Sequence, residues 1–377
     1  MFNRNTTPLL ASFIAVASAF SSVVTANTLT PDQDEYTLFT PNGTLDTFLI
    51  DKTGTTVHTW HSEHRPALST YLLESGELLR TAAVPETPAT FTGNAGGMLE
   101  ILDWQSNVVW SATIASETYM SHHDAEQLPN GNILVLAWEA KTADEALALG
   151  RTSIEDETLW ADAVYEICRA SATNPCVDGE IVWRWSAWDH IVQNVDQSIT
   201  YNYVDNIAAH PNKVDLNYFS GRGSSDWGHA NAVDYNVEKD LIMISVHNFN
   251  EYWVLDHADA SKGIVYRAGN PASQGRAGRQ TLFGQHDVQW IEPGLPGAGN
   301  ILLFNNGMNR PAGDFSTVEE ICYEGNCRPG AVLSKYGEGV NGSFYSSHIS
   351  GAQRLKNGNT LVCEGLEGRF FEYNENQ

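Results

Sequence analysis

The chain has 377 residues, with 21 Lys and Arg against 46 Asp and Glu and a formal net charge of −25. This acidity argues against nucleic acid and anionic membranes as partners, because both would be repelled. An anionic substrate would need a locally cationic pocket.

Residues 1–26 have the pattern of a signal peptide. Arg4 supplies a short positive region, Leu9 to Phe20 an apolar run, and Val24-Thr25-Ala26 a small-residue cleavage site. The apolar run is shorter than the roughly 18 to 20 residues of a membrane-spanning helix, and no other stretch reaches that length. We therefore expect a single domain over 27–377, periplasmic or secreted, without a membrane span.

Five cysteines in an exported chain suggest disulfides. Cys168 and Cys176 follow one apolar strand, and Cys322 and Cys327 follow another, so each pair is predicted to close a hairpin end. Cys363 lies inside an apolar segment and is expected to be a buried thiol. The cysteine spacings do not indicate a metal site.

After the signal region, short strands and turns repeat along the chain. One unit is a hairpin followed by a second hairpin that ends in an aromatic strand, and Thr142–Leu149 is the one helical candidate. Units of roughly 45 to 65 residues with about four strands each are typical of propeller blades. The sequence thus predicts an all-β, six-bladed β-propeller of four-stranded antiparallel blades. The units lie near 36–60, 68–112, 119–187, 228–268, 284–337 and 346–377, and the last ends early, so that closure needs an N-terminal strand or further residues.

Histidines recur at one point of this unit, at the start of the innermost strand, where a propeller has the mouth of its central channel. Asp124, Asn231 and Asp287 align beside them in one column. The repeated histidines are His122, His123, His229, His286 and His348. They predict a histidine-lined pocket, although a repeated histidine can also be structural and a propeller can be only a binding platform.

Clustered imidazoles can bind a metal, act as acid and base, or act as nucleophiles. His122 and His123 are adjacent, so on a strand they should point to opposite faces and not toward one ion. No metal is therefore predicted, although ligands from different blades remain an alternative. The net charge favours anion handling by the histidines with nearby arginines, which are Arg222, Arg276, Arg279 and Arg310.

Three segments carry a family resemblance. They are Asp226-Trp227-Gly228-His229-Ala230-Asn231-Ala232-Val233, then Gln285-His286-Asp287 with 295–302, and 350–355 through 358–361. From about Tyr36 to Tyr373 the chain resembles the bacterial aryl-sulfate sulfotransferases, which do not use the nucleotide sulfate donor. The resemblance implies a six-bladed propeller with an axial active site and no cofactor.

The same resemblance implies the roles of single histidines. In that family a histidine takes the sulfuryl group from a phenyl sulfate as a sulfohistidine and passes it to a phenol. His286 matches this nucleophile and His229 a second active-site histidine. His122 or His123 matches a third, with His123 favoured.

One position departs from the family. The family has an arginine 18 residues after the histidine that matches His229, where this chain has His247. An arginine holds sulfate oxygens in two places, whereas an imidazole offers one donor. Either the anion is bound elsewhere, with His348 and Arg310 as candidates, or the substrate differs.

The leading prediction is ping-pong transfer of a sulfuryl group from a small aromatic sulfate to a phenolic acceptor. A second hypothesis is a propeller lyase acting on sulfated or uronic acid-containing polysaccharide, with a histidine base and Tyr119 or Tyr345 as the acid. A third is a non-catalytic binding module.

Overall fold

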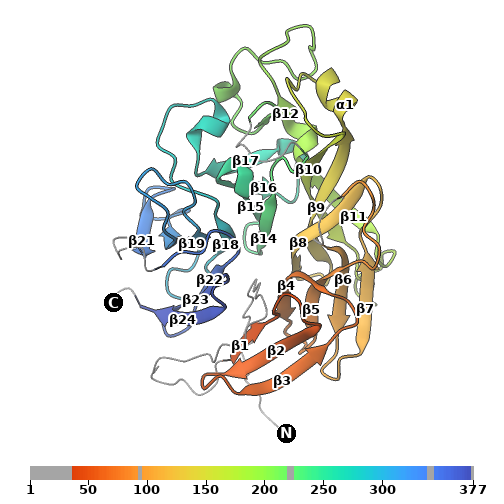
Figure 1. Cartoon of the computed structure of the whole chain (residues 1–377), viewed down its shortest axis with the longest axis vertical. Helices are drawn as coiled ribbons and strands as arrows, with labels where there is room; N and C mark the ends of the chain where they lie inside the picture. The colour runs from red at the N-terminus through yellow and green to blue at the C-terminus, as the bar shows by residue number, and fades with distance from the viewer. Residues whose placement is uncertain (1–35, 92–95, 219–224, 338–343, 375–377) are drawn as a thin grey trace.

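Figure 1 shows the protein as a computed structural model, which describes residues 36–91, 96–218, 225–337 and 344–374. Six small antiparallel sheets surround a common centre, and the first strands of successive blades contact one another there. The predicted six-bladed β-propeller is confirmed. The predicted signal peptide lies outside the described residues.

The blades follow one another along the chain. Blade 1 contains β1 (Tyr36–Phe39), β2 (Asp46–Asp51) and β3 (Thr56–His61); blade 2 contains β4 (Pro66–Leu72), β5 (Leu78–Ala83), β6 (Gly97–Leu102) and β7 (Val108–Thr113). Blade 3 contains β8 (Tyr119–Gln127), β9 (Ile133–Thr142), β10 (Thr158–Ile167) and β11 (Ile181–Ser186); blade 4 contains β14 (Ala230–Asn236), β15 (Leu241–Val246), β16 (Glu251–Asp256) and β17 (Ile264–Ala268). Blade 5 contains β18 (His286–Trp290), β19 (Ile301–Asn305), β20 (Thr317–Ile321) and β21 (Val332–Tyr336); blade 6 contains β22 (Gly351–Arg354), β23 (Thr360–Glu364) and β24 (Arg369–Tyr373).

Short helices and strands lie in the connections between the strands of the blades. The predicted helix is α1 (Ala143–Ala148). Thr142 and Glu145 form a capping box at its N-terminus. The parallel pair β12 (Ile191–Val192) and β13 (Val214–Asp215) lies in the long connection after blade 3. The 3₁₀ turns are η1 (Ala187–His190), η2 (Ile207–Ala209), η3 (His247–Phe249), η4 (Ala260–Lys262) and η5 (Pro271–Gln274).

The repeated Asn-Gly-Asn turns have a structural role. The last asparagine of the turns at 130–132 and 357–359, and the equivalent Asn300 after Gly-Ala-Gly, donate from Nδ2 to a carboxylate on the third strand of their own blade. The pairs are Asn132 with Glu166 at 2.5 Å, Asn300 with Glu320 at 2.6 Å and Asn359 with Glu372 at 3.0 Å. This part of the repeat therefore stabilises the blades.

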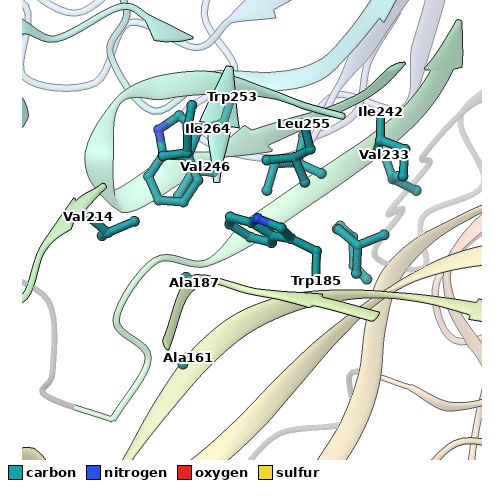
Figure 2. Close-up of a cluster of buried hydrophobic side chains, with 14 of the residues drawn as sticks. Ala161, Trp185, Ala187, Val214, Val233, Ile242, Val246, Trp253, Leu255 and Ile264 are labelled. Carbon is teal, nitrogen blue, oxygen red and sulfur yellow. The ribbon is translucent and has the colours of Figure 1, made fainter. Parts of the chain in front are cut away.

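Neighbouring blades pack through tryptophans. Figure 2 shows Trp185 of β11 between Ala161 and Ala187 on one side and the apolar side chains of blade 4 on the other. Trp185 and Trp253 are both almost fully buried, and their ring centroids lie 6.2 Å apart. Burial of such large side chains holds blade 3 against blade 4.

Polar side chains link the innermost strands of successive blades. Asp124 Oδ2 accepts from the Val233 amide at 2.9 Å, and Asp287 Oδ2 accepts from the Ala352 amide at 2.8 Å. Asn231 Nδ2 donates to the Gln285 carbonyl at 2.9 Å. The aligned column Asp124, Asn231 and Asp287 thus fixes blades 3 to 6 in order. Burial raises the pKa of Asp124 to about 6 and that of Asp287 to about 7.

The ring closes between blade 1 and blade 6. Phe39 of β1 packs against Phe370 of β24, with ring centroids 5.4 Å apart. Among the described residues these two blades have three strands each, and β1 pairs with β2 and not with β24. Of the two alternatives for closure, an N-terminal strand is not supplied by β1, and the described contact between the two blades is made by side chains.

Both predicted cysteine pairs form disulfides. Cys168–Cys176 links the end of β10 to the segment before β11, and Cys322–Cys327 follows β20. Cys363 is a buried free thiol. The two disulfides are consistent with a periplasmic or extracellular protein. Across the described ranges, no helix has the length and apolarity needed to cross a membrane.

The closure predicts an energetic coupling between Phe39 and Phe370. In a double-mutant cycle of Phe39→Ala and Phe370→Ala, we expect a coupling free energy of about 0.5–1.5 kcal/mol in urea unfolding. The control cycle pairs Phe39→Ala with Phe315→Ala. The Phe315 ring lies against the Arg310 guanidinium next to blade 5. That control should be additive, and an equally additive Phe39 and Phe370 cycle would contradict closure by this contact.

Candidate active site

Five imidazoles form a continuous arc at the inner ends of blades 3, 4 and 5. Successive ring centroids are 5.0, 4.7, 5.4 and 5.3 Å apart. The members, in order, are His122, His123, His229, His247 and His286. We call this set the histidine arc.

Bulged backbone turns these side chains inward. The strand pairing shifts register within β8, between Ser121 and Ala125, and at the start of β14 and β18, and His123 and His229 adopt left-handed φ values of 56° and 55°. As a result, Nδ1 of His122 and Nδ1 of His123 lie 2.8 Å apart. The prediction that these neighbours point to opposite faces is wrong, because the bulge breaks strand alternation. Such backbone is concentrated at functional sites.

The two neighbours differ in position. His122 stacks on Trp138 at 4.0 Å, whereas His123 faces His229. Burial lowers the pKa of His122 to about 3, and burial followed by the charge of His229 lowers the pKa of His123 well below its usual value. Both rings are therefore neutral, and their Nδ1 contact requires one of them to carry its proton on Nδ1. His123 is the one that contacts the next ring of the arc, His229.

The tautomer of His286 follows from its partner Asn306. Nδ2 of Asn306 donates to the carbonyls of Ser346 at 2.9 Å and Ile349 at 2.8 Å, so its Oδ1 is the atom that faces Nδ1 of His286 at 2.8 Å. An oxygen there can only accept, and the Gly284 carbonyl at 3.1 Å is a second acceptor. Nδ1 therefore carries the proton and Nε2 the lone pair.

Two further observations agree with this state. Nε2 of His286 accepts a hydrogen bond from the Ile349 amide at 3.2 Å. Burial, followed by the charge of His247, lowers the pKa of His286 well below its usual value. His286 is thus a neutral imidazole whose lone pair lies on Nε2.

His229 has a different partner. Its Nδ1 lies 2.5 Å from Oδ2 of Asp226, and its side chain is 23% exposed, whereas the other four residues of the arc are buried. Burial alone would raise the pKa of Asp226, but the charge and hydrogen bond of His229, together with the charges of His122 and His247, outweigh it and the pKa is lowered. An ionised carboxylate at this distance favours the imidazolium form of His229.

Asp162 fixes the backbone around His229. Its Oδ1 accepts from the Ala230 amide at 2.8 Å and lies 4.0 Å from Nε2 of His122. A Cβ on Gly228 would lie only 1.7 Å from Asp162 Oδ2, so only glycine fits there. Burial raises the pKa of Asp162 to about 7.

His247, where the family resemblance leads us to expect an arginine, lies within the arc. Nδ2 of Asn248 donates to the carbonyls of Asp226 at 2.8 Å and Trp227 at 3.4 Å, which directs its Oδ1 to Nδ1 of His247 at 3.0 Å. Nδ1 of His247 therefore carries a proton. In the neutral form its Nε2 is an acceptor and cannot replace the donors of an arginine.

The other two predicted anion ligands have local partners. Arg310 donates to Thr317 Oγ1 at 2.7 Å and to the Phe315 carbonyl at 3.1 Å, and lies 3.8 Å from Glu319. His348 is exposed, and its Nδ1 lies 2.9 Å from Ser347 Oγ. Its neighbour Ile349, through the backbone, is the residue that contacts His286.

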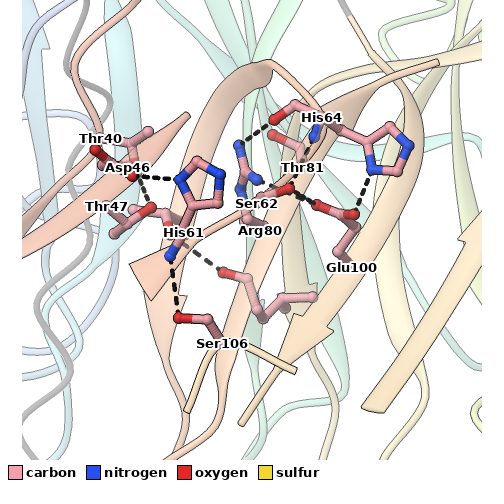
Figure 3. Close-up of polar contacts among 12 residues, drawn as sticks. Thr40, Asp46, Thr47, His61, Ser62, His64, Arg80, Thr81, Glu100 and Ser106 are labelled. Atoms are coloured by element: carbon pink, nitrogen blue, oxygen red, sulfur yellow. Dashed lines mark hydrogen bonds and ion pairs between the residues drawn. The ribbon is translucent and has the colours of Figure 1, made fainter. Parts of the chain in front are cut away.

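Histidines elsewhere serve as structural partners. Figure 3 shows the contacts of His61 with Asp46 and of His64 with Glu100. Nδ1 of His61 lies 2.6 Å from Asp46 Oδ1, and Nδ1 of His64 lies 2.6 Å from Glu100 Oε1. The second carboxylate oxygen of Glu100 accepts a hydrogen bond from Arg80. Within the residues that the structure describes, no three His, Cys, Asp or Glu side chains are arranged to hold a metal ion. The arc combines a neutral imidazole whose lone pair lies on Nε2, His286, with an imidazole that contacts a carboxylate, His229. Such a pair suits nucleophilic and acid–base chemistry.

Some members of the site carried no assigned role in the sequence. Asp226 belongs to the motif that contains His229. Its position three residues before His229 is the one signal that could have indicated a pair of carboxylate and imidazole. Asp162, Asn248 and Asn306 have no such signal, because their partners lie on other strands or are backbone carbonyls.

Solved structures similar to this chain are remote. Virginiamycin B lyase from Staphylococcus aureus is 8% identical with a TM-score of 0.42, covering 97% of this chain and 88% of that one. A luciferin-regenerating enzyme is 9% identical with a TM-score of 0.40, covering 85% and 81%. A putative 6-phosphogluconolactonase from Bacteroides uniformis is 11% identical with a TM-score of 0.41, covering 87% and 74%. No curated protein matches the chain.

The family comparison is extensive. The family described as Arylsulfotransferase (ASST) matches residues 47–377, which include the whole histidine arc. This match supports aryl sulfotransferase activity in general, with small-molecule aryl sulfates and phenols as substrates. The chain, as its sequence motifs predicted, belongs to the arylsulfotransferase family of transferase enzymes.

Proposed function

We propose that this protein transfers a sulfuryl group from an aryl sulfate to a phenol in a ping-pong reaction through a sulfohistidine on Nε2 of His286. The observation that carries the proposal is the tautomer of His286. Its Nδ1 is bound to Asn306 Oδ1, which leaves the Nε2 lone pair as its nucleophilic atom. A neutral imidazole nitrogen is a good nucleophile at physiological pH.

In the first half-reaction, the Nε2 lone pair of His286 attacks sulfur and the bond between sulfur and the aryl oxygen breaks. The leaving oxygen keeps the electron pair and takes a proton from the His229 imidazolium. Asp226, 2.5 Å from Nδ1 of His229, stabilises that imidazolium beforehand and orients its Nε2 proton. The geometry thereby supports opposite protonation states for His286 and His229.

In the second half-reaction, the phenol loses its proton to the now neutral His229 and its oxygen attacks sulfur. The bond between nitrogen and sulfur breaks, and the electron pair returns to Nε2 of His286. Both histidines then have their initial protonation states. Charge in such a loose transition state lies on the peripheral oxygens, so nearby donors dominate catalysis. We assign His122, His123 and His247 to the polar wall that positions the substrate.

Replacement of the nucleophile is expected to stop turnover. His286→Ala should lower kcat with a chromogenic aryl sulfate and phenol by at least about a thousandfold, because alanine has no nitrogen lone pair with which to form the sulfuryl intermediate. His61→Ala is the control, since His61 is an exposed histidine paired with Asp46 outside the arc. Thermal melting checks that both variants are folded, and near-normal turnover by folded His286→Ala would refute the assignment.

Loss of the carboxylate partner is expected to change the pH profile. In Asp226→Asn the imidazolium of His229 loses its support, so the alkaline limb of the kcat profile should move to lower pH and kcat should fall roughly 10²- to 10⁴-fold. The low pKa of Asp226 means that this support persists as the pH falls in the unmodified protein.

The matched control is Asp46→Asn, which removes the carboxylate from the similar but exposed contact with His61. It should leave the profile unchanged. An Asp226→Asn profile with an unshifted alkaline limb would show that His229 is not the acid supported by Asp226.

A further inference from the structure

The nucleophilic atom of the site already has a partner. Nε2 of His286 accepts a hydrogen bond from the backbone amide of Ile349 at 3.2 Å. A sulfur atom bonded to Nε2 would have to occupy the direction of the same lone pair. The Ile349 amide and the sulfuryl group therefore compete for one position.

The backbone that presents this amide has an unusual conformation. Ile349 and Ser350 have φ values of 52° and 84°, so two consecutive non-glycine residues are left-handed. A β-branched residue such as isoleucine rarely adopts this conformation. Strained backbone of this kind persists where the surroundings hold it, and is concentrated at ligand-binding and catalytic sites.

The segment 346–350, which we call the capping turn, is held by buried polar contacts. Nδ2 of Asn306 donates to the carbonyls of Ser346 and Ile349 at 2.9 and 2.8 Å. Ser350 Oγ donates to Ser346 Oγ at 2.8 Å and accepts from the Gly365 amide at 3.0 Å. Asn306 thus orients both the nucleophile and the amide that caps it.

Two imidazoles of the arc present an acceptor, and not a donor, at Nε2. His286 and neutral His247 each carry their proton on Nδ1, where asparagine oxygens accept it, so their Nε2 atoms are acceptors. The arginine of the family is absent at 247. A backbone N–H next to the reacting nitrogen is a donor that needs no titration, in a protein whose formal net charge is −25.

We propose that the Ile349 amide is a catalytic group that caps Nε2 of His286 in the resting enzyme and donates to a sulfuryl oxygen during transfer. This inference rests on the proposed function of His286. When the aryl sulfate binds, the hydrogen bond from the Ile349 amide to Nε2 of His286 breaks, and the capping turn shifts to admit the sulfur atom. The bond between nitrogen and sulfur forms as the aryl oxygen leaves, and the amide keeps its proton throughout. A sulfuryl oxygen carries more negative charge than a neutral imidazole nitrogen, so the amide gains a stronger acceptor.

The direct test removes this N–H alone. Incorporation of the α-hydroxy acid analogue of isoleucine at position 349 replaces the amide with an ester and keeps the side chain. We expect kcat with an aryl sulfate to fall about 10²-fold, the usual effect of losing one such donor. KM for the aryl sulfate should not rise, because the 349 ester has no N–H that competes with the sulfuryl group for Nε2 of His286.

The matched control is the same ester replacement at Ser106. Ser106 is also a left-handed non-glycine residue, with φ of 68°, and its amide donates to the Asp103 carbonyl at 3.0 Å in a surface turn of blade 2. This control should leave kcat and KM unchanged. Wild-type kcat in the 349 ester, or a fall in kcat together with a raised KM, would overturn the proposal.

A second measurement uses the unmodified protein, in case the ester at 349 prevents folding. With ¹⁵N-isoleucine labelling, the Ile349 amide resonance should move when the sulfuryl adduct forms, and an unmoved resonance would contradict the inference. Mass spectrometry of the same sample separates the two hypotheses. If no adduct forms on His286, the proposed function fails; if the adduct forms while Ile349 does not respond, only the role of the amide fails.

Discussion

The buried side chain of Asn306 is the constraint on which the geometry of the site depends. Its amide has two carbonyl acceptors on one side, from Ser346 and Ile349, and one imidazole on the other. These partners can be satisfied in only one orientation, and that orientation fixes the proton of His286 on Nδ1. The same asparagine positions the capping turn, so the tautomer of His286 and the position of the Ile349 amide have one common cause.

Burial accounts for how an acidic protein can handle an anion with histidines. The rings of His122, His123 and His286 are withdrawn from water, and burial keeps the pKa of each below its usual value. As neutral rings, these three histidines contribute a fixed position and nitrogen lone pairs to the site, and not positive charge. In our account a cationic imidazole arises at His229, beside Asp226. Protonation is thus assigned by local partners, and the overall charge of the chain has little bearing on the reacting atoms.

Much of the architecture was predictable because it repeats. Short strands and turns recur in every clear unit, while the Asn-Gly-Asn turns and the column of Asp124, Asn231 and Asp287 recur in some of them, and repetition separates a pattern from chance. The cysteine pairs were predictable from their spacing at strand ends. The incomplete end blades were harder, because the first and last units lack the full pattern.

The site was predictable only in part. The histidines of the arc were identified, but the convergence of His122 and His123 depends on the left-handed backbone at His123, which no strand pattern encodes. Asn306 and Asp162 act through contacts between distant segments. The Ile349 amide is a backbone group, so its role is independent of side-chain chemistry and invisible in a residue pattern.

The most direct test of the account is to locate the sulfuryl group on the protein. The unmodified enzyme is mixed with an aryl sulfate in the absence of a phenol, quenched, digested and analysed by tandem mass spectrometry. The account predicts one sulfuryl group on His286, which disappears when phenol is added before the quench. An adduct on another residue, or turnover without any adduct, would contradict it.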